Sequence, residues 1–169
     1  VGSDVVQVFG DPYFPDYSIS VSQETTAKAI PKVKCRNKGC SDEAATRAEV
    51  TSFMSTNGSG NWVARESRPD LAAQVSLSQQ RMPNPTLGDL RMANQMVRRA
   101  RQFADLKWVI VSIPFTRLLF TMNPDASLQN RGDSRTQGGY MLGYGDVSLL
   151  YGDLAWWTPC SWRSTRIKR

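Results

Sequence analysis

The 169-residue chain contains no histidine, and this absence excludes whole classes of catalytic site. Ser-His and Cys-His nucleophilic machinery cannot be built without an imidazole base. Only three cysteines are present, too few for a disulfide framework, and a zinc site would need carboxylates to complete its ligands. Cys35 and Cys40 are close enough in sequence to bridge across a tight turn, whereas Cys160 lies far away. We therefore expect no metal site and no cofactor.

Long hydrophobic runs are also absent. No apolar stretch approaches the ~20 residues that cross a bilayer, so the sequence predicts no transmembrane segment. The first ten residues, "VGSDVVQVFG", have neither a basic start nor a long apolar segment, so they do not resemble a secretory signal or a transit peptide. We expect an intracellular protein, and the start at Val1 rather than Met indicates a processed chain or a piece of a longer one.

The net charge of +6 is unevenly distributed. Up to Asp70 there are eight Lys and Arg against nine Asp and Glu, whereas from Leu71 onward there are thirteen against six. A basic surface in this second part could meet nucleic acid, an anionic membrane face or an acidic protein. Plain solubilising charge explains the same excess equally well.

The first sixty residues predict two short strands and one helix. Apolar and polar residues alternate between Val5 and Val21 around a turn, "GDPYFPD", and "YSISVSQ" is the better strand. A basic loop at residues 32–40 follows. A helix is expected over "SDEAATRAEVTSFMST", with Ser41 as its cap and "NGSG" as its end.

The middle of the chain predicts further helices. Pro69 suits the first turn of a helix, so we expect a short helix before Arg68 and another over residues 69–81. Thr86, with Asp89 three residues on, predicts the cap of a helix that runs to about residue 104. Its apolar face is formed by Leu90, Ala93, Val97, Ala100 and Ala104, and its polar face is basic.

After this helix the hydrophobic period changes to two. Four stretches predict strands separated by turns: "KWVIVSIPF", "TRLLFTMNPDAS", "GGYMLGYG" and "DLAWWTPCSW". The predicted fold class is therefore α+β, with a helical middle segment followed by an antiparallel β-meander from about residue 117.

Asp125 lies where one of these strands is expected to finish. A carboxylate there could be held rigidly and face solvent, as metal-dependent phosphodiester chemistry requires, but that chemistry needs several converging carboxylates. The other nearby acids, Asp133, Asp146 and Asp153, fall in predicted turns, where Asp is common for backbone reasons. From the residues alone the turn interpretation of Asp125 is favoured.

A wider pattern changes this weighting. Four stretches follow one another along the chain: "NWVARESRPDLAAQVSLSQ", "NPTLGDLRMANQMVRRAR", "PDASLQNRGDSRTQGGYMLGY" and "AWWTPCSWRSTRIKR". In order and rough spacing they resemble copia-type retrotransposon polyproteins, in the region where the reverse transcriptase ends and the ribonuclease H domain begins. The upstream "SISVSQETTAKAI" also looks like the family's corresponding segment. The resemblance covers most of the chain.

The resemblance implies two segments and a role for one aspartate. Residues 1–116 would correspond to the reverse-transcriptase C-terminal or connection region, and residues 117–169 to a partial ribonuclease H-like meander comprising that fold's first three strands. Asp125 would be the domain's first metal-binding carboxylate. The family's next carboxylate lies beyond the stretch that "STRIKR" resembles, and no paired-Asp polymerase motif is present. We therefore expect a non-catalytic protein, in which Asp125 is vestigial.

Two functions remain open. The first is a nucleic-acid-binding remnant whose arginines and lysines contact phosphates. Its candidate contacts are Arg91, Arg98, Arg101, Arg131, Arg135, Arg163, Arg166, Lys168 and Arg169. The second is a structural or accessory component of a larger protein assembly, with Trp156, Trp157 and Trp162 buried against partner chains. We favour the second function slightly. An active nuclease would require carboxylates from another chain.

Overall fold

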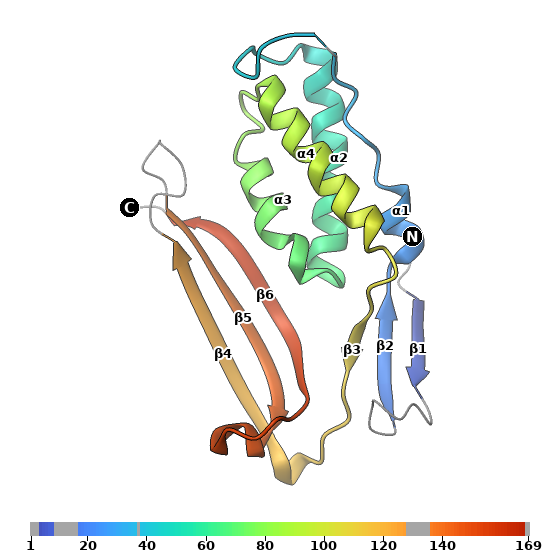
Figure 1. Cartoon of the computed structure of the whole chain (residues 1–169), viewed down its shortest axis with the longest axis vertical. Coiled ribbons are helices and arrows are strands. Elements are labelled where there is room, and N and C mark those ends of the chain that lie inside the picture. The colour runs from blue at the N-terminus through green and yellow to red at the C-terminus, as the bar shows by residue number, and fades with distance from the viewer. Residues whose placement is uncertain (1–3, 9–16, 37, 128–135, 168–169) are drawn as a thin grey trace. The chain divides into compact units, whose positions relative to one another are not determined.

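The computed structural model describes residues 4–8, 17–36, 38–127 and 136–167, and the chain forms two compact units. The β unit combines Val1–Ser22 with Lys107–Arg169, and the helical unit comprises Gln23–Leu106. Figure 1 shows both sheets in the former and the helices α1 to α4 in the latter. The predicted α+β class is confirmed. Strands from both sequence segments, 1–116 and 117–169, belong to the β unit.

The first sheet of the β unit has the antiparallel order β1-β2-β3. Its strands are β1 (Asp4–Val8), β2 (Ser18–Ser22) and β3 (Trp108–Ile110). The two strands predicted near the start of the chain therefore form and pair with each other. A strand that follows the helical unit joins them, so this sheet links distant parts of the sequence.

The second sheet is the predicted antiparallel meander, in the order β4-β5-β6. Its strands are β4 (Leu118–Ser127), β5 (Thr136–Asp146) and β6 (Trp157–Ile167). A 3-10 turn at Phe115–Arg117 precedes β4, and another at Val147–Tyr151 joins β5 to β6. The guanidinium of Arg117 donates two 2.7 Å hydrogen bonds to the Asp146 carboxylate, which ties the start of β4 to the end of β5.

The helical unit contains four α-helices. They are α1 (Glu24–Ala29), α2 (Arg47–Glu66), α3 (Ala72–Gln79) and α4 (Leu87–Gln102). Helices α2, α3 and α4 pack against one another (Figure 1). No helix in the described part of the chain has the length and apolar character that crossing a membrane requires.

The expected bounds of α2 are wrong at both ends. Ser41 does not cap the helix. The N-cap is Thr46, five residues after Ser41, and Thr46 forms a complete capping box with Glu49. "NGSG" does not end it either, and the short helix expected before Arg68 is the last part of α2. Gly60 packs closely against α4, since a Cβ there would lie 2.7 Å from Cε at the end of the buried Met96 side chain, which would have to move.

The other helix signals are confirmed. Pro69 begins a 3-10 turn, Pro69–Leu71, that leads directly into α3. Thr86 and Asp89 form the predicted capping box of α4. The predicted apolar face of α4 is buried throughout, and it contributes to both hydrophobic clusters of the helical unit.

The two units differ sharply in their cores. Both hydrophobic clusters lie in the helical unit, around side chains such as Phe53, Leu71 and Val97. Among the β-unit residues whose side chains the structure describes (17–22, 107–126 and 136–166), only Val21 and Val111 are buried hydrophobic residues. The helical unit thus resembles a self-sufficient packed domain, whereas the β unit buries little apolar area.

A polar seam joins β3 to the edge strand β6 within the β unit. The buried hydroxyl of Thr158 donates to the Val109 carbonyl and accepts from the Val111 N–H, both at 3.1 Å. The Trp108 indole N–H donates to the Pro159 carbonyl at 2.8 Å. Because backbone groups of one sheet meet side-chain groups of the other, hydrogen bonds join the two sheets where hydrophobic contacts are few.

One face of the second sheet is filled by its own residues. The Trp157 indole extends from β6 across β5, and its N–H donates to the Thr121 hydroxyl of β4 at 2.7 Å. A Cβ at Gly143 would lie 2.2 Å from Trp157 Cζ2, and one at Gly145 would lie 2.5 Å from Leu149 Cδ1. Because these two residues have no side chain, they leave room for Trp157 and Leu149 to pack over β5.

Gly58 and Gly60 provide a matched test of helix packing in α2. A Cβ at Gly58 meets nothing within 4 Å, so Gly58→Ala should stabilise the helical unit by about 0.5–1 kcal/mol through helix propensity. Gly60→Ala gains the same propensity but displaces Met96, and it should be at least about 1 kcal/mol less favourable. Urea unfolding followed by circular dichroism at 222 nm measures both. Equal effects would contradict the packing role of Gly60.

Gly143 tests the filling of the sheet face. Gly143→Ala should destabilise the β unit by about 1–3 kcal/mol, because the added methyl overlaps the Trp157 ring. In a double-mutant cycle with Trp157→Leu, much of this cost should disappear, with a coupling of about 1 kcal/mol or more. The measurement is chemical unfolding of the four proteins. Strictly additive costs would show that the indole does not occupy the glycine site.

Candidate functional site

Asp125 was expected where a strand finishes, and it lies within β4, two residues before the strand ends at Ser127, with its side chain exposed. Its cross-strand neighbours are Gly139 on β5 and then Ser164 on β6, neither of them a carboxylate. Asp146 is engaged by Arg117, whose hydrogen bonds hold the pKa of Asp146 well below its usual range. In the described part of the chain no three Cys, Asp or Glu side chains gather closely enough to hold a metal ion. Among the described residues, the neighbours of Asp125 across the sheet therefore include no second carboxylate.

The arginines of α4 are divided between structural and exposed positions. The Arg91 guanidinium donates to the Gly39 carbonyl and the Ser41 hydroxyl, at 3.0 and 3.2 Å. Arg101 donates to the Ile30 carbonyl at 2.7 Å. Both side chains therefore hold preceding segments of the chain against α4, and of the three predicted contacts on this helix only Arg98 is fully exposed.

The remaining predicted phosphate contacts lie near β6 or outside the described residues. Arg163 and Arg166 are both exposed on β6, three positions apart, so their side chains leave opposite faces of the sheet. The positions outside the described residues are Arg131, Arg135, Lys168 and Arg169. The structure thus does not bring the described arginines of β6 together on one face.

The three predicted partner-binding tryptophans have different environments. Trp157 is half-buried across Gly143, and Trp162 is half-buried with its ring edge against Trp108, 5.4 Å between centroids. Only Trp156 is exposed, at 42%. Two of the three tryptophans therefore contribute to the sheet's own packing.

A larger apolar surface, not singled out from the sequence, covers the opposite face of the meander. Three cross-strand pairs form it: Phe120 with Tyr144, Met122 with Leu142, and Pro124 with Tyr140. We call these six residues the apolar sheet face. Phe120 and Met122 are 70% and 60% exposed, and the Phe120 and Tyr144 rings meet edge to face at 6.4 Å. Pro124 is exposed too, whereas Tyr140, Leu142 and Tyr144 are half-buried, and the Tyr144 hydroxyl donates to the Val111 carbonyl at 3.3 Å. The exposed part of the face therefore lies mainly on β4, and adjoining exposed apolar residues make it a candidate interaction surface.

The signal for this surface was present in the alternation of the two strands. Apolar residues recur at every second position in "LFTMNP" and in "YMLGY", and such residues share one face of a strand. The register that pairs them across the sheet depends on the β4–β5 connection, which sequence alone does not fix. The apolar sheet face was therefore detectable as two stripes, but not as one surface.

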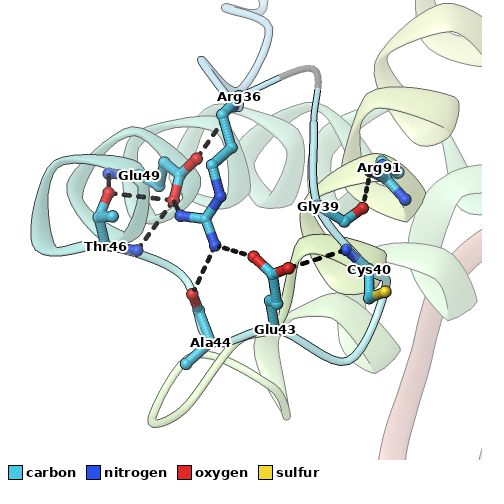
Figure 2. A network of polar contacts seen from close by, with 8 residues as sticks. All are labelled: Arg36, Gly39, Cys40, Glu43, Ala44, Thr46, Glu49 and Arg91. Atoms are coloured by element: carbon cyan, nitrogen blue, oxygen red, sulfur yellow. Dashed lines mark hydrogen bonds and ion pairs between the residues drawn. The ribbon is translucent and has the colours of Figure 1, made fainter.

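A second cluster of charges lies in the helical unit and is fully engaged in holding the chain (Figure 2). Arg36 donates its backbone N–H and one guanidinium nitrogen to Glu49, at 2.9 and 3.0 Å. The other guanidinium nitrogen donates to Glu43 and to the Ala44 carbonyl. Thr46 donates to Glu49 as well, through its N–H and its hydroxyl. Glu49 accepts four hydrogen bonds, and Glu43 accepts one from Arg36 and one from the Cys40 N–H, so the cluster fastens Arg36 and the segment 40–46 to the start of α2.

Hydrogen bonds lower the pKa of both carboxyls in this cluster. The guanidinium of Arg36 lowers the pKa of Glu43, and the backbone N–H of Arg36 is the largest cause for Glu49. The three cysteines, including Cys40 beside this cluster, are free thiols. The sequence indicated only a basic loop here, because the contacts join residues brought together by folding.

Comparison of the chain with protein families, with curated proteins and with solved structures gives no match. The resemblance to copia-type polyproteins therefore stays a prediction. The functional argument depends on the geometry of this chain alone.

The Arg36 cluster predicts a specific pH dependence of the helical unit. Because the folded pKa of Glu43 and of Glu49 is lowered, their stabilisation is present above the unfolded pKa of about 4.3 and is lost as pH falls through the folded values. The urea midpoint at 222 nm should thus decrease between about pH 5 and pH 3. Arg36→Ala should make this decrease shallower, and Arg98→Ala, an exposed control, should not. An unchanged slope in Arg36→Ala would contradict the assignment.

Proposed function

We propose that the chain is a non-catalytic structural or accessory component of a larger protein assembly, in which the apolar sheet face contacts a partner. The observation that supports this proposal most strongly is that the β unit buries few hydrophobic side chains while it exposes large ones. Among residues 17–22, 107–126 and 136–166 it buries only the hydrophobic residues Val21 and Val111, while Phe120 and Met122 are largely exposed. A small sheet without a covering layer is marginal in water, so burial of this face against another chain would supply stability that the unit lacks.

The alternative role as a nucleic-acid-binding remnant is supported by fewer features. Arg98, Arg163 and Arg166 are exposed and carry charge suited to phosphates. Arg91 and Arg101 donate to carbonyl groups of their own chain, so two of the predicted phosphate contacts already have partners within the protein. Derivation from a retroelement remains part of the proposal, on the strength of the sequence resemblance.

A pair of aspartate substitutions on β4 tests the proposal. Met122→Asp places a charge in the apolar sheet face. The amount of this variant protein recovered in the native assembly should fall at least about tenfold. Asn123→Asp is the matched control, since the neighbouring side chain is also exposed and lies on the opposite face, and it should assemble normally. The measurement is native mass spectrometry of the tagged protein purified from its source.

Nuclease treatment separates the two candidate roles in the same experiment. Protein partners that survive nuclease and are lost with Met122→Asp would support the assembly role. Loss of bound mass with nuclease, together with normal behaviour of Met122→Asp, would contradict it and favour nucleic-acid binding.

A further inference from the structure

The apolar sheet face has a defined width. Its pairs span β4 and β5, and the facing positions on β6 are polar: Thr158 opposite Tyr144, Ser161 opposite Leu142, and Arg163 opposite Tyr140. Thr158 is buried, and its hydroxyl and that of Tyr144 donate to the carbonyls of Val109 and Val111, so the first sheet covers the β6 side at this end of the band. Neighbouring strands are about 4.8 Å apart, so two strands with their side chains give an apolar band roughly 10 Å wide. This width matches the diameter of an α-helix, about 10 Å. A second sheet would instead cover all three strands.

The length of the band suits a helix of several turns. Apolar residues continue on the same side of β4 from Leu118 to Ala126, eight positions apart. At about 3.3 Å per residue this is roughly 26 Å, the length of an α-helix of about 18 residues. The band therefore has the dimensions of one amphipathic helix lying along the strands.

Among the described residues on this face of the sheet, Arg163 carries the charge that is not paired with an acidic side chain. Arg163 is exposed on the β6 side, next to Tyr140. At one end Arg117 is neutralised by Asp146. Asp125 leaves the opposite face of β4, since it lies one position from Pro124. An incoming helix would therefore meet a positive charge along one flank and apolar side chains beneath it.

We infer that the apolar sheet face receives an amphipathic α-helix of a partner protein, whose flank toward β6 carries Glu or Asp opposite Arg163. This inference rests on the proposed function and specifies the partner of the same surface. The helix α4 of a second copy fits less well. The predicted apolar face of α4 is buried in its own unit, and its exposed side carries Arg98, which would repel Arg163.

Two synthetic probes test the inference with the full chain. Both are stapled peptides of about 18 residues with leucines at helical spacing, and one carries Glu along the flanks where the other carries Lys. Fluorescence anisotropy at low salt should show the Glu peptide binding about fivefold tighter, a preference that high salt removes. Arg163→Glu should reverse the preference, whereas Arg166→Glu, on the opposite face of β6, should leave it unchanged.

The same titrations contain the outcomes that would overturn the inference. Met122→Asp should abolish binding of both peptides, and Asn123→Asp should not. Absence of binding by either peptide, or a Glu preference that persists in Arg163→Glu, would show that the partner is not such a helix. Concentration-dependent dimers in sedimentation velocity that Met122→Asp disperses would assign the face to a second copy.

The outcomes also distinguish this inference from the proposed function. If neither peptide binds but recovery of the native assembly still requires Met122, the helical partner is wrong and the assembly role stands. If Met122→Asp assembles normally, the proposed function itself fails.

Discussion

The contact between Trp157 and Gly143 determines which side of the second sheet is left for other molecules. The indole crosses β5 to reach the Thr121 hydroxyl on β4, and the glycine beneath it leaves the space that the ring occupies. One face of the sheet is thereby filled from within, with Leu149 covering Gly145 beside it. On the other face Phe120, Met122 and Pro124 of β4 remain exposed, whereas their partners on β5, Tyr140, Leu142 and Tyr144, are half-buried. Trp157 thus makes one face of the sheet a packed face, and the proposed contact surface is the opposite face.

The two units are stabilised by different kinds of contact. The helical unit has two hydrophobic clusters, two complete capping boxes and the Arg36 cluster, all of which stabilise it internally. The β unit is instead held by strand pairing and by polar contacts such as the Thr158 hydroxyl between its sheets. Polar contacts contribute modestly to net stability, whereas burial of apolar area contributes most. An assembly contact on the β unit would therefore both bind the chain and complete its folding.

The parts of this structure that could be predicted are those with a local cause. Thr86 and Asp89 are three residues apart, so the start of α4 followed from sequence, and alternation gave the meander. The end of α2 was mispredicted, because "NGSG" has the composition of a stop while Gly60 serves contact with the distant Met96. Arg91 and Arg101 likewise suggested a free basic face, although they donate to the carbonyl groups of Gly39 and Ile30, which lie 52 and 71 residues away in sequence. Asp125 was placed correctly on a strand, but its neighbours depended on a register that local pattern cannot supply.

The most direct test of the central claim is oxidative footprinting of methionines, in the isolated chain and in the native assembly. Met122 lies in the apolar sheet face, and Met92, which is 50% exposed on α4, is an internal reference. Burial of the apolar sheet face by a partner predicts that Met122 is oxidised readily in the isolated chain and strongly protected in the assembly, relative to Met92. Equal oxidation of Met122 in both states would contradict the assignment of this face as the contact surface.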